Sequence, residues 1–154
     1  MKITLLTVGK LGRSVEAQLA RDYAERATAS GRALGLGPVE VVEVEARKPG
    51  KAAEAEVILP HLDGAHVIAC DEHGKVRTSR DFAAYIGKLR DDGVRKLVLI
   101  IGGADGLDGA LLDKASETLA FGPQTWPHAL ARVMLAEQVY RAVTILSGSP
   151  YHRD

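Results

Sequence analysis

Short runs of β-branched and aliphatic residues alternate along the chain with longer segments whose apolar positions fall three or four residues apart. The short runs predict strands at residues 3–8, 39–44, 66–70, 96–101 and, with a weaker pattern, 118–121. The longer segments predict helices at residues 14–30, 52–62, 79–91, 107–117 and 127–146. Because such alternation requires crossover connections, we expect an α/β domain with a largely parallel sheet and helices on both faces.

Helix start and stop signals agree with several of these boundaries. Ser79 precedes the third predicted helix, and Asp81 falls in its first turn, where the helix dipole favours a carboxylate. Gly93 follows as a stop, and Pro127 opens the last helix where its missing N–H costs little. No repeat, low-complexity tract or long linker interrupts the pattern, so a single domain over residues 1–154 is expected.

Composition changes this picture little. The 154 residues, 46% of them hydrophobic, suffice for one core. Twenty Lys and Arg balance twenty Asp and Glu, so any contact with nucleic acid depends on local clusters of charge. The single cysteine, Cys70, lies in an apolar run, which fits a packed thiol in a reducing compartment. No apolar run reaches the roughly twenty residues that cross a bilayer, so we expect a cytoplasmic protein without membrane contact.

Residues 96–109, KLVLIIGGADGLDG, carry the first chemical signal, an apolar strand that runs directly into a series of glycines. Glycine permits positive φ and lets backbone N–H groups approach a ligand, and open α/β folds bind ligands at the carboxyl edge of the sheet. Routine strand-to-helix turns also use glycine, so this segment alone leaves both interpretations open. It lacks the Lys-Ser or Lys-Thr of a phosphate-binding loop and is no GxGxxG after the first strand, which disfavours nucleotide hydrolysis and NAD binding.

Residues 121–142, FGPQTWPHALARVMLAEQVYRA, combine a loop of Gly and Pro with a helix that carries polar side chains. At about 100° per residue, His128 and Arg132 share one side of the helix, and Glu137 and Arg141 lie about 180° away. Apolar residues fill the arcs between, as expected of a helix that also packs against a second subunit. The simpler alternatives are a surface i,i+4 pair for Glu137 and Arg141 and a capping or packing role for His128.

The chain ends in SGSPYHRD, which places an aromatic ring, an imidazole and a guanidinium directly after a proline. Such groups can stack, transfer a proton and hold negative charge, but a solvated tail is the simpler interpretation of a chain end. A serine hydrolase that uses Ser147 or Ser149 with His152 is disfavoured because the chain lacks a GxSxG elbow.

Together the segments IGGADG, TWPH, RVMLAEQVYRA and PYHR, in this order and spacing, resemble the ribosomal large subunit methyltransferase H family of the SPOUT class. The similarity covers nearly the whole chain and is most specific in residues 97–153. The resemblance implies a SPOUT-type domain with a C-terminal trefoil knot, a rare exception among protein chains, and a homodimer whose partner subunit completes each cofactor pocket. It also implies methyl transfer from S-adenosylmethionine to N3 of a pseudouridine in helix 69 of 23S rRNA within the ribosome.

Carried over residue by residue, the family's cofactor site falls on eight positions, where backbone groups are expected to do most of the binding. These positions are Cys70, Gly102, Phe121, Gly122, Pro123, Gln124, Thr125 and Trp126. Two of them depart from the family, which commonly has Leu in place of Cys70 and an aliphatic residue in place of Trp126. Trp126 therefore either covers the adenine or belongs to the core.

The N3 position of pseudouridine carries a proton near neutral pH, so its methylation needs a base and a cation beside the flanking carbonyl oxygens. We expect His152, or a water that it holds, to accept the proton, and Arg153 and Arg141 to face the uracil oxygens or RNA phosphates. Tyr151 is expected to stack on the base or to form a hydrogen bond with it. The five histidines show no ligand spacing, so no metal is expected.

Two alternatives remain at this point: a SPOUT methyltransferase that acts on another RNA position, including transfer RNA, and a noncatalytic module that binds a nucleotide or the ribosome. Because the chain has no net charge and no appended RNA-binding module, we expect recognition of the shape of the assembled ribosome. Candidate phosphate contacts, each of which is equally well explained as solvated surface, are Lys10, Arg13, Arg47, Lys48 and Lys51.

Overall fold

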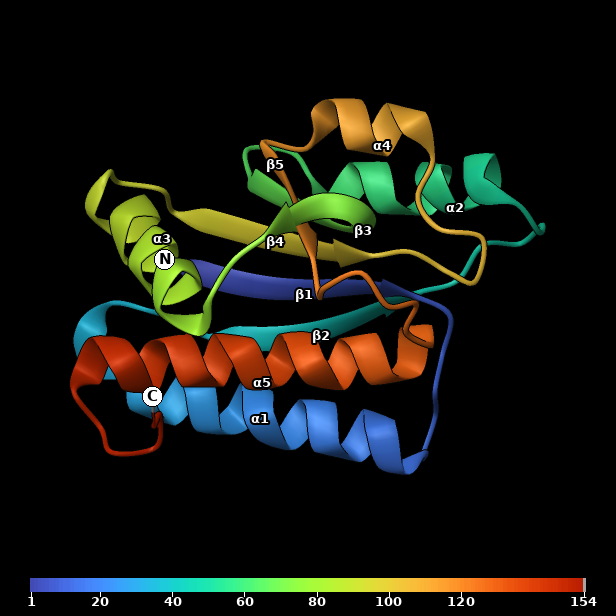
Figure 1. The fold of residues 1–154 in the computed structure, drawn as a ribbon. Coiled ribbons are helices and arrows are strands. Elements are labelled where there is room, and N and C mark those ends of the chain that lie inside the picture. The colour runs from blue at the N-terminus through green and yellow to red at the C-terminus, as the bar shows by residue number, and fades with distance from the viewer. Residues whose placement is uncertain (154) are drawn as a thin grey trace.

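A five-stranded sheet in the order β2-β1-β4-β3-β5 forms the centre of the protein, whose computed structural model describes residues 1–153 (Figure 1). Every pair of neighbouring strands is parallel, which confirms the predicted sheet. The strands are β1 (Lys2–Val8), β2 (Val39–Val44), β3 (His66–Val76), β4 (Lys96–Ile101) and β5 (Glu117–Ala120).

Helices cover both faces of the sheet, as the pattern predicts (Figure 1). One face packs against α1 (Val15–Gly31), α3 (Ser79–Asp91) and α5 (His128–Ser147), and the other against α2 (Lys51–Ile58) and α4 (Gly109–Lys114). The β4 residues Leu97 and Leu99 belong to the first core, whereas Val98 and Ile100 belong to the second. This alternation is the period of two that sends successive strand side chains to opposite faces.

The last helix, α5, is the most enclosed helix of the first face. It contacts α1, α3 and the sheet, and it lies beside α1 along most of its length (Figure 1). The α5 residues Leu135, Val139 and Val143 are fully buried. Burial of α5 from more than one side is thus produced within a single chain, and the homodimer stays a prediction.

Several predicted boundaries were wrong by a few residues. The side chain of Thr78, not Ser79, caps α3, because its hydroxyl accepts a hydrogen bond from the Asp81 N–H at 3.1 Å. The helix predicted at 52–62 ends at Ile58 and continues as a 3₁₀ turn, Leu59–His61, and the helix predicted at 107–117 is confined to α4. No helix within residues 1–153 has the length and apolar character needed to span a membrane.

The largest difference concerns β3, which was predicted to end at Cys70 and instead runs to Val76. Cys70 and Lys75 both take Leu119 of β5 as their partner, so the residues between them form an irregularity beside β5. Arg77, directly after β3, donates two hydrogen bonds to the carboxylate of Glu117 at 2.8 and 2.6 Å. The end of β3 is thereby tied to the start of β5, and the trefoil knot stays a prediction.

Candidate functional site

A cleft of about 690 Å³ lies at the carboxyl edge of the sheet, between the turn that follows β4 and the loop that follows β5. Seven of the eight predicted cofactor positions line it, namely Cys70, Gly102, Phe121, Gly122, Gln124, Thr125 and Trp126. Pro123 belongs to the same loop but lies outside the lining of the cleft. A cleft of this size falls within the range of about 300 to 1,000 Å³ that encloses drug-sized ligands.

The glycine turn after β4 is folded tightly upon itself. A Cβ on Gly102 would lie 2.8 Å from the carbonyl oxygen of Gly106, which has a φ of +80°. The Gly103 N–H donates a hydrogen bond to Oε2 of Glu54 at 3.3 Å. Only glycine fits at Gly102 and Gly106 without strain in the backbone, so these two positions bring main chain into the lining of the cleft.

The loop after β5 forms the opposite wall. Gly122 has a φ of +95°, and a Cβ there would meet no atom within 4 Å, so its backbone borders open space. The indole N–H of Trp126 donates a hydrogen bond to the carbonyl oxygen of Phe121 at 3.3 Å. Trp126 is 39% exposed and lines the cleft, so it is not a core residue. Its ring closes the loop and borders the ligand space.

Cys70 lines the floor of the cleft from within β3 and not from the end of a strand. Burial, helped by the negative charge of Asp71, raises the pKa of the Cys70 thiol to about 12. The thiol therefore stays protonated at neutral pH and acts as a small apolar surface.

Three further residues that the sequence did not predict also line the cleft, namely Asp71, Glu72 and His73. They were missed because the apolar pattern ends at Cys70 and predicts a loop. Asp71 accepts a hydrogen bond from the His73 N–H at 2.9 Å. Lys51 and His128 line the same cleft, which therefore carries charges of both signs at its mouth.

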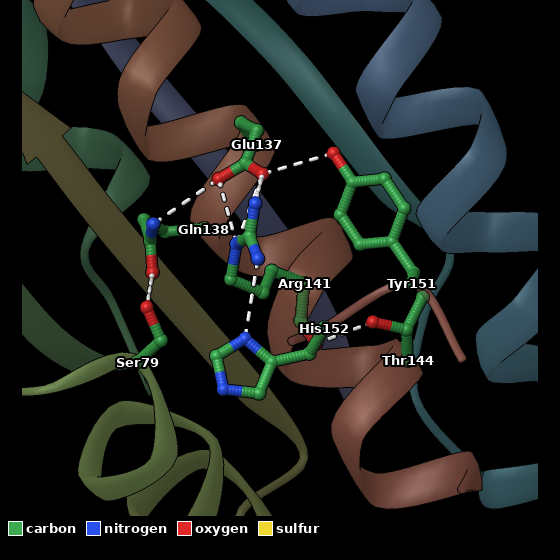
Figure 2. A network of polar contacts seen from close by, with 7 residues as sticks. All are labelled: Ser79, Glu137, Gln138, Arg141, Thr144, Tyr151 and His152. Carbon is green, nitrogen blue, oxygen red and sulfur yellow. Dashed lines mark hydrogen bonds and ion pairs between the residues drawn. The ribbon is translucent and has the colours of Figure 1, made fainter. Parts of the chain in front are cut away.

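The four predicted catalytic residues do not line the cleft, and three of them, Arg141, Tyr151 and His152, lie together at the second half of α5 and the chain end (Figure 2). Arg141 donates hydrogen bonds from Nε and Nη2 to Glu137 Oε1, at 3.0 and 2.5 Å, and from Nη1 to His152 Nδ1 at 3.1 Å. The Tyr151 hydroxyl donates to the same Glu137 oxygen at 3.0 Å, and its ring lies 4.9 Å from the Arg141 guanidinium carbon. Arg153 is exposed.

The surface-pair interpretation of Glu137 and Arg141 is therefore wrong, since their side chains are only 17% and 24% exposed and share a network with the tail. The network reaches α3 through Gln138, which accepts a hydrogen bond from the Ser79 hydroxyl at 2.9 Å (Figure 2). Burial, together with hydrogen bonding to Tyr23 and Glu137, raises the pKa of Tyr151, so that its hydroxyl stays protonated.

We call Glu137, Arg141, Tyr151 and His152 the tail network, and within one chain none of them lines the cleft, although Glu137 lines a neighbouring groove that shares Phe121 and Gly122 with it. Ala131 lines the cleft, and Arg141 follows ten residues later, about 15 Å of helical rise along α5. The structure thus gathers most of the predicted cofactor positions around the cleft and most of the predicted catalytic positions around the second half of α5.

Arg132, which shares one side of α5 with His128, makes buried contacts that hold the loop after β1. It is 2% exposed and donates hydrogen bonds to the carbonyl oxygens of Val8 and, at 2.8 Å, Gly9. Its Nη1 donates to Glu43 Oε1 at 3.0 Å. Desolvation lowers the pKa of the Arg132 guanidinium, and the charge of Glu43 opposes this shift. No group of three His, Cys, Asp or Glu side chains in residues 1–153 is arranged to hold a metal ion.

Comparison with known proteins gives this fold and cleft a class. A family model described as "Predicted SPOUT methyltransferase" matches residues 1–152, and the chain belongs to this family of SPOUT methyltransferases. Two solved structures share the fold at a TM-score of 0.56, a probable methylase family protein from Haemophilus influenzae Rd KW20 and a probable methyltransferase from Bordetella pertussis Tohama I. The Haemophilus influenzae protein is 15% identical, and the match covers 99% of this chain and 70% of that one. The Bordetella pertussis protein is 17% identical, and the match covers 92% of this chain and 96% of that one.

The particular relatives are more informative. A protein named Ribosomal RNA large subunit methyltransferase H from Caulobacter sp. (strain K31) is 82% identical over 154 residues, which is 100% of both chains. Proteins of the same name from Caulobacter vibrioides and Phenylobacterium zucineum are 75% and 70% identical over 100% of this chain and 99% and 100% of their own. The resemblance found in the sequence is therefore confirmed.

Proposed function

We propose that this chain uses S-adenosylmethionine to methylate N3 of a pseudouridine in helix 69 of 23S rRNA within the ribosome. The proposal rests on one observation: seven of the predicted cofactor positions line a single cleft in a chain that belongs to the SPOUT methyltransferases. The relatives' name supports an rRNA substrate of the large subunit. A substrate in the ribosome also supports a cytoplasmic place of action.

The cleft fits the cofactor. Its volume is suited to a nucleoside with a short side chain, and backbone N–H and C=O groups of the glycine turn and of the 121–126 loop are available to read an adenine. When bound, S-adenosylmethionine supplies an electrophilic methyl group on a sulfonium sulfur. The protein's part is then to place the acceptor base, to accept its proton and to stabilise the resulting charge.

The tail network supplies groups for these tasks. Because an arginine only donates, the hydrogen bond from Arg141 makes His152 Nδ1 an acceptor, which puts the proton of the neutral ring on Nε2. In the proposed mechanism the Arg141 N–H that donates a hydrogen bond to His152 Nδ1 donates instead to a uracil carbonyl oxygen when the base enters. The freed Nδ1 then accepts the N3 proton, directly or through a water, while Arg141 and Arg153 stabilise the anionic oxygen.

Glu137 keeps Arg141 and Tyr151 in place for this exchange. Its carboxylate accepts hydrogen bonds from both side chains, so the guanidinium and the phenol ring lie next to each other. The Tyr151 ring is also 4.7 Å from the ring of Tyr140, which leaves an aromatic surface on which a base can stack.

A homodimer would join the two halves of the site. The tail of a second subunit can approach the cleft that the tail of the same chain does not reach. An apolar groove of about 490 Å³ beside α1 and α5 supports such a contact, since it is lined by Leu19, Phe82, Val133 and Met134 among others. Val76 at its edge is 65% exposed, which is unusual for a large apolar side chain in a monomer.

The proposal is tested with ribosomes from a strain that lacks this gene. Ribosomes, isolated subunits and free rRNA are incubated with the protein and labelled S-adenosylmethionine, and the modified nucleotide is mapped by mass spectrometry. We expect label at one pseudouridine of helix 69, and label in transfer RNA or at another rRNA position would contradict the assignment. Deletion of residues 151–154 should leave the calorimetric affinity for S-adenosylmethionine unchanged and abolish methylation, and retained methylation would refute a catalytic tail.

A noncatalytic module is the second candidate, and the same experiment decides it. Such a protein would bind ribosomes or the cofactor and transfer no label. Mixing the tail deletion with a variant whose cleft is blocked by Gly122→Trp tests the composite site. Restored activity in the mixture supports a site shared between subunits, and its absence despite dimer formation contradicts that arrangement.

A further inference from the structure

The loops that follow β1 and β2 bring five cations to the edge of the sheet that carries the cleft. Residues 9–13 and 46–51 contain no Asp or Glu, although the whole chain has as many acidic as basic residues. All five basic side chains belong to exposed residues. We call this surface the basic rim, and it consists of Lys10, Arg13, Arg47, Lys48 and Lys51.

One of the two loops of the basic rim, residues 9–13, is anchored by partly buried contacts. The Gly9 N–H donates a hydrogen bond to the Val44 carbonyl oxygen at 2.8 Å, which joins the two loops where they leave the sheet. Glu43 accepts hydrogen bonds at one oxygen from the Leu11 N–H at 3.3 Å and from Arg132 at 3.0 Å. Because Arg132 also holds the Gly9 carbonyl oxygen, α5 and both strands fix the backbone of the loop that carries Lys10 and Arg13.

The charges of the basic rim are mostly left without protein partners. Lys10 lies 3.5 Å from Glu45, and within residues 1–153 the other four have no carboxylate oxygen within 4.0 Å. At the opposite edge, by contrast, Lys88 and Arg90 are paired with Asp92 and Asp91 at 2.6 and 2.8 Å. The rim therefore presents four cations that no carboxylate in the described part of the chain neutralises at close range and that an external anion can approach.

We propose that the basic rim binds the phosphate backbone of the RNA whose base enters the cleft. The proposal rests on the proposed function, because it assumes an RNA substrate. Lys51 belongs both to the rim and to the lining of the cleft, so a strand that follows the rim leads to the methyl-transfer site. Cations that contact phosphates release condensed counterions, which gives affinity for folded RNA without a need for base-specific contacts.

The test compares two double variants that remove the same kinds of charge. Arg47→Gln with Lys48→Gln changes the rim, and Arg95→Gln with Lys88→Gln changes the opposite edge. Methyl transfer to ribosomes and filter binding to ribosomes and to protein-free rRNA are measured over a range of salt concentrations. For the rim variant we expect the KM for ribosomes to rise on the order of ten-fold, with kcat at saturation and the affinity for S-adenosylmethionine unchanged.

The slope of log affinity against log salt should also become shallower by about 1.5 for the loss of two phosphate contacts. The opposite-edge variant should match the wild type in all these measurements, and both variants should keep the wild-type melting temperature. Equal RNA binding by the two variants would overturn the proposal. If the rim variant binds ribosomes more weakly but binds protein-free rRNA as the wild type does, the rim contacts an acidic ribosomal protein and not RNA, which also overturns the proposal.

Failure of the proposed function has a different signature. A wild-type protein that binds ribosomes without methylating them contradicts the proposed function, and the filter-binding comparison of the two double variants still decides the role of the rim.

Discussion

Gly74 lies directly against the backbone of Leu119: a Cβ on Gly74 would be 2.7 Å from both the nitrogen and the carbonyl carbon of that residue. The neighbouring atoms belong to the main chain of β5 and cannot move aside as the end of a side chain can. Since β5 leads into the 121–126 loop, this contact between β3 and β5 helps to set the wall of the cleft.

Replacement of Gly74 by alanine should therefore destabilise the protein by about 2 kcal/mol or more, because β3 and β5 must separate to admit one methyl group. Affinity for S-adenosylmethionine should fall as the loop shifts. Gly109→Ala is the matched control, since a Cβ at Gly109 meets no atom within 4 Å and its φ is not positive. Urea unfolding measures the stability, and calorimetry measures the affinity for S-adenosylmethionine. Equal stability of the two variants would show that β3 and β5 can separate without a cost in free energy, which contradicts the prediction.

The Arg77–Glu117 pair makes the stability of the same region depend on pH. Hydrogen bonding to Arg77 lowers the pKa of Glu117 below its ordinary value of 4.5. Stability from the pair is thus fully present above that ordinary value and is lost as the pH falls through the lower, folded value. The side chains are only 13% and 18% exposed, so we expect a loss of about 2 kcal/mol on full protonation.

Unfolding free energies measured between pH 3 and pH 7 test this expectation. Glu117→Gln should be less stable than the wild type at pH 7 and should show a smaller decrease toward pH 3. An unchanged pH dependence in Glu117→Gln would assign the acid sensitivity to other carboxylates. A charge exchange, Arg77→Glu with Glu117→Arg, should recover part of the loss at neutral pH.

The sequence predicted most of the fold because its strongest patterns are local. β2, β4 and α3 were predicted with the bounds that the structure has, since short runs rich in β-branched and aliphatic residues mark the two strands and a Gly93 stop marks the end of α3. The end of β3 was not predicted, because residues 71–76 are mainly polar and become a strand only through pairing with β5. The cleft residues Asp71, Glu72 and His73 were missed for the same reason.

The position of the predicted catalytic residues could not be read from the sequence either. The motif names Tyr151 and His152, but it does not show that their partner Arg141 lies about 15 Å of helical rise from Ala131, which lines the cleft. The hydrogen bonds that bind the tail to Glu137 and Arg141 depend on the return of the chain after Gly148, which caps α5 with a φ of +72°. Such a return has no periodic pattern in the sequence.

Cys70 should react slowly with disulfide reagents in the native protein. With a pKa of about 12, its thiolate fraction at pH 8 is about a thousand-fold smaller than that of a free thiol. Because the residue lines the cleft, S-adenosylmethionine should slow the reaction further. Kinetics with a chromogenic disulfide reagent measure this, with urea-unfolded protein as the fully reactive control. A native rate close to that of glutathione would contradict the burial of the thiol.

Glu137→Gln should reduce kcat on the order of ten-fold and leave the affinity for S-adenosylmethionine unchanged, because Arg141 and Tyr151 lose the charged acceptor that holds them. Glu56→Gln on α2 is the matched control, since Glu56 is exposed and lies on the other face of the sheet. Single-turnover methylation with each variant gives the comparison. A KM effect without a change in kcat would place Glu137 in substrate binding and not in the positioning of the catalytic tail.

Arg132→Ala provides the last test, since a buried ion pair loses one partner and two carbonyl oxygens lose their donor. We expect a loss of about 3 kcal/mol or more in unfolding free energy, because Glu43 keeps its charge in a partly buried place. Arg26→Ala removes an exposed pair with Asp22 and should cost under about 0.5 kcal/mol. Arg132→Ala should also raise the KM for ribosomes, because the loop that carries Lys10 loses its anchor. If Arg132→Ala unfolds like the wild type and keeps its ribosome KM, Arg132 neither stabilises the fold nor anchors the basic rim.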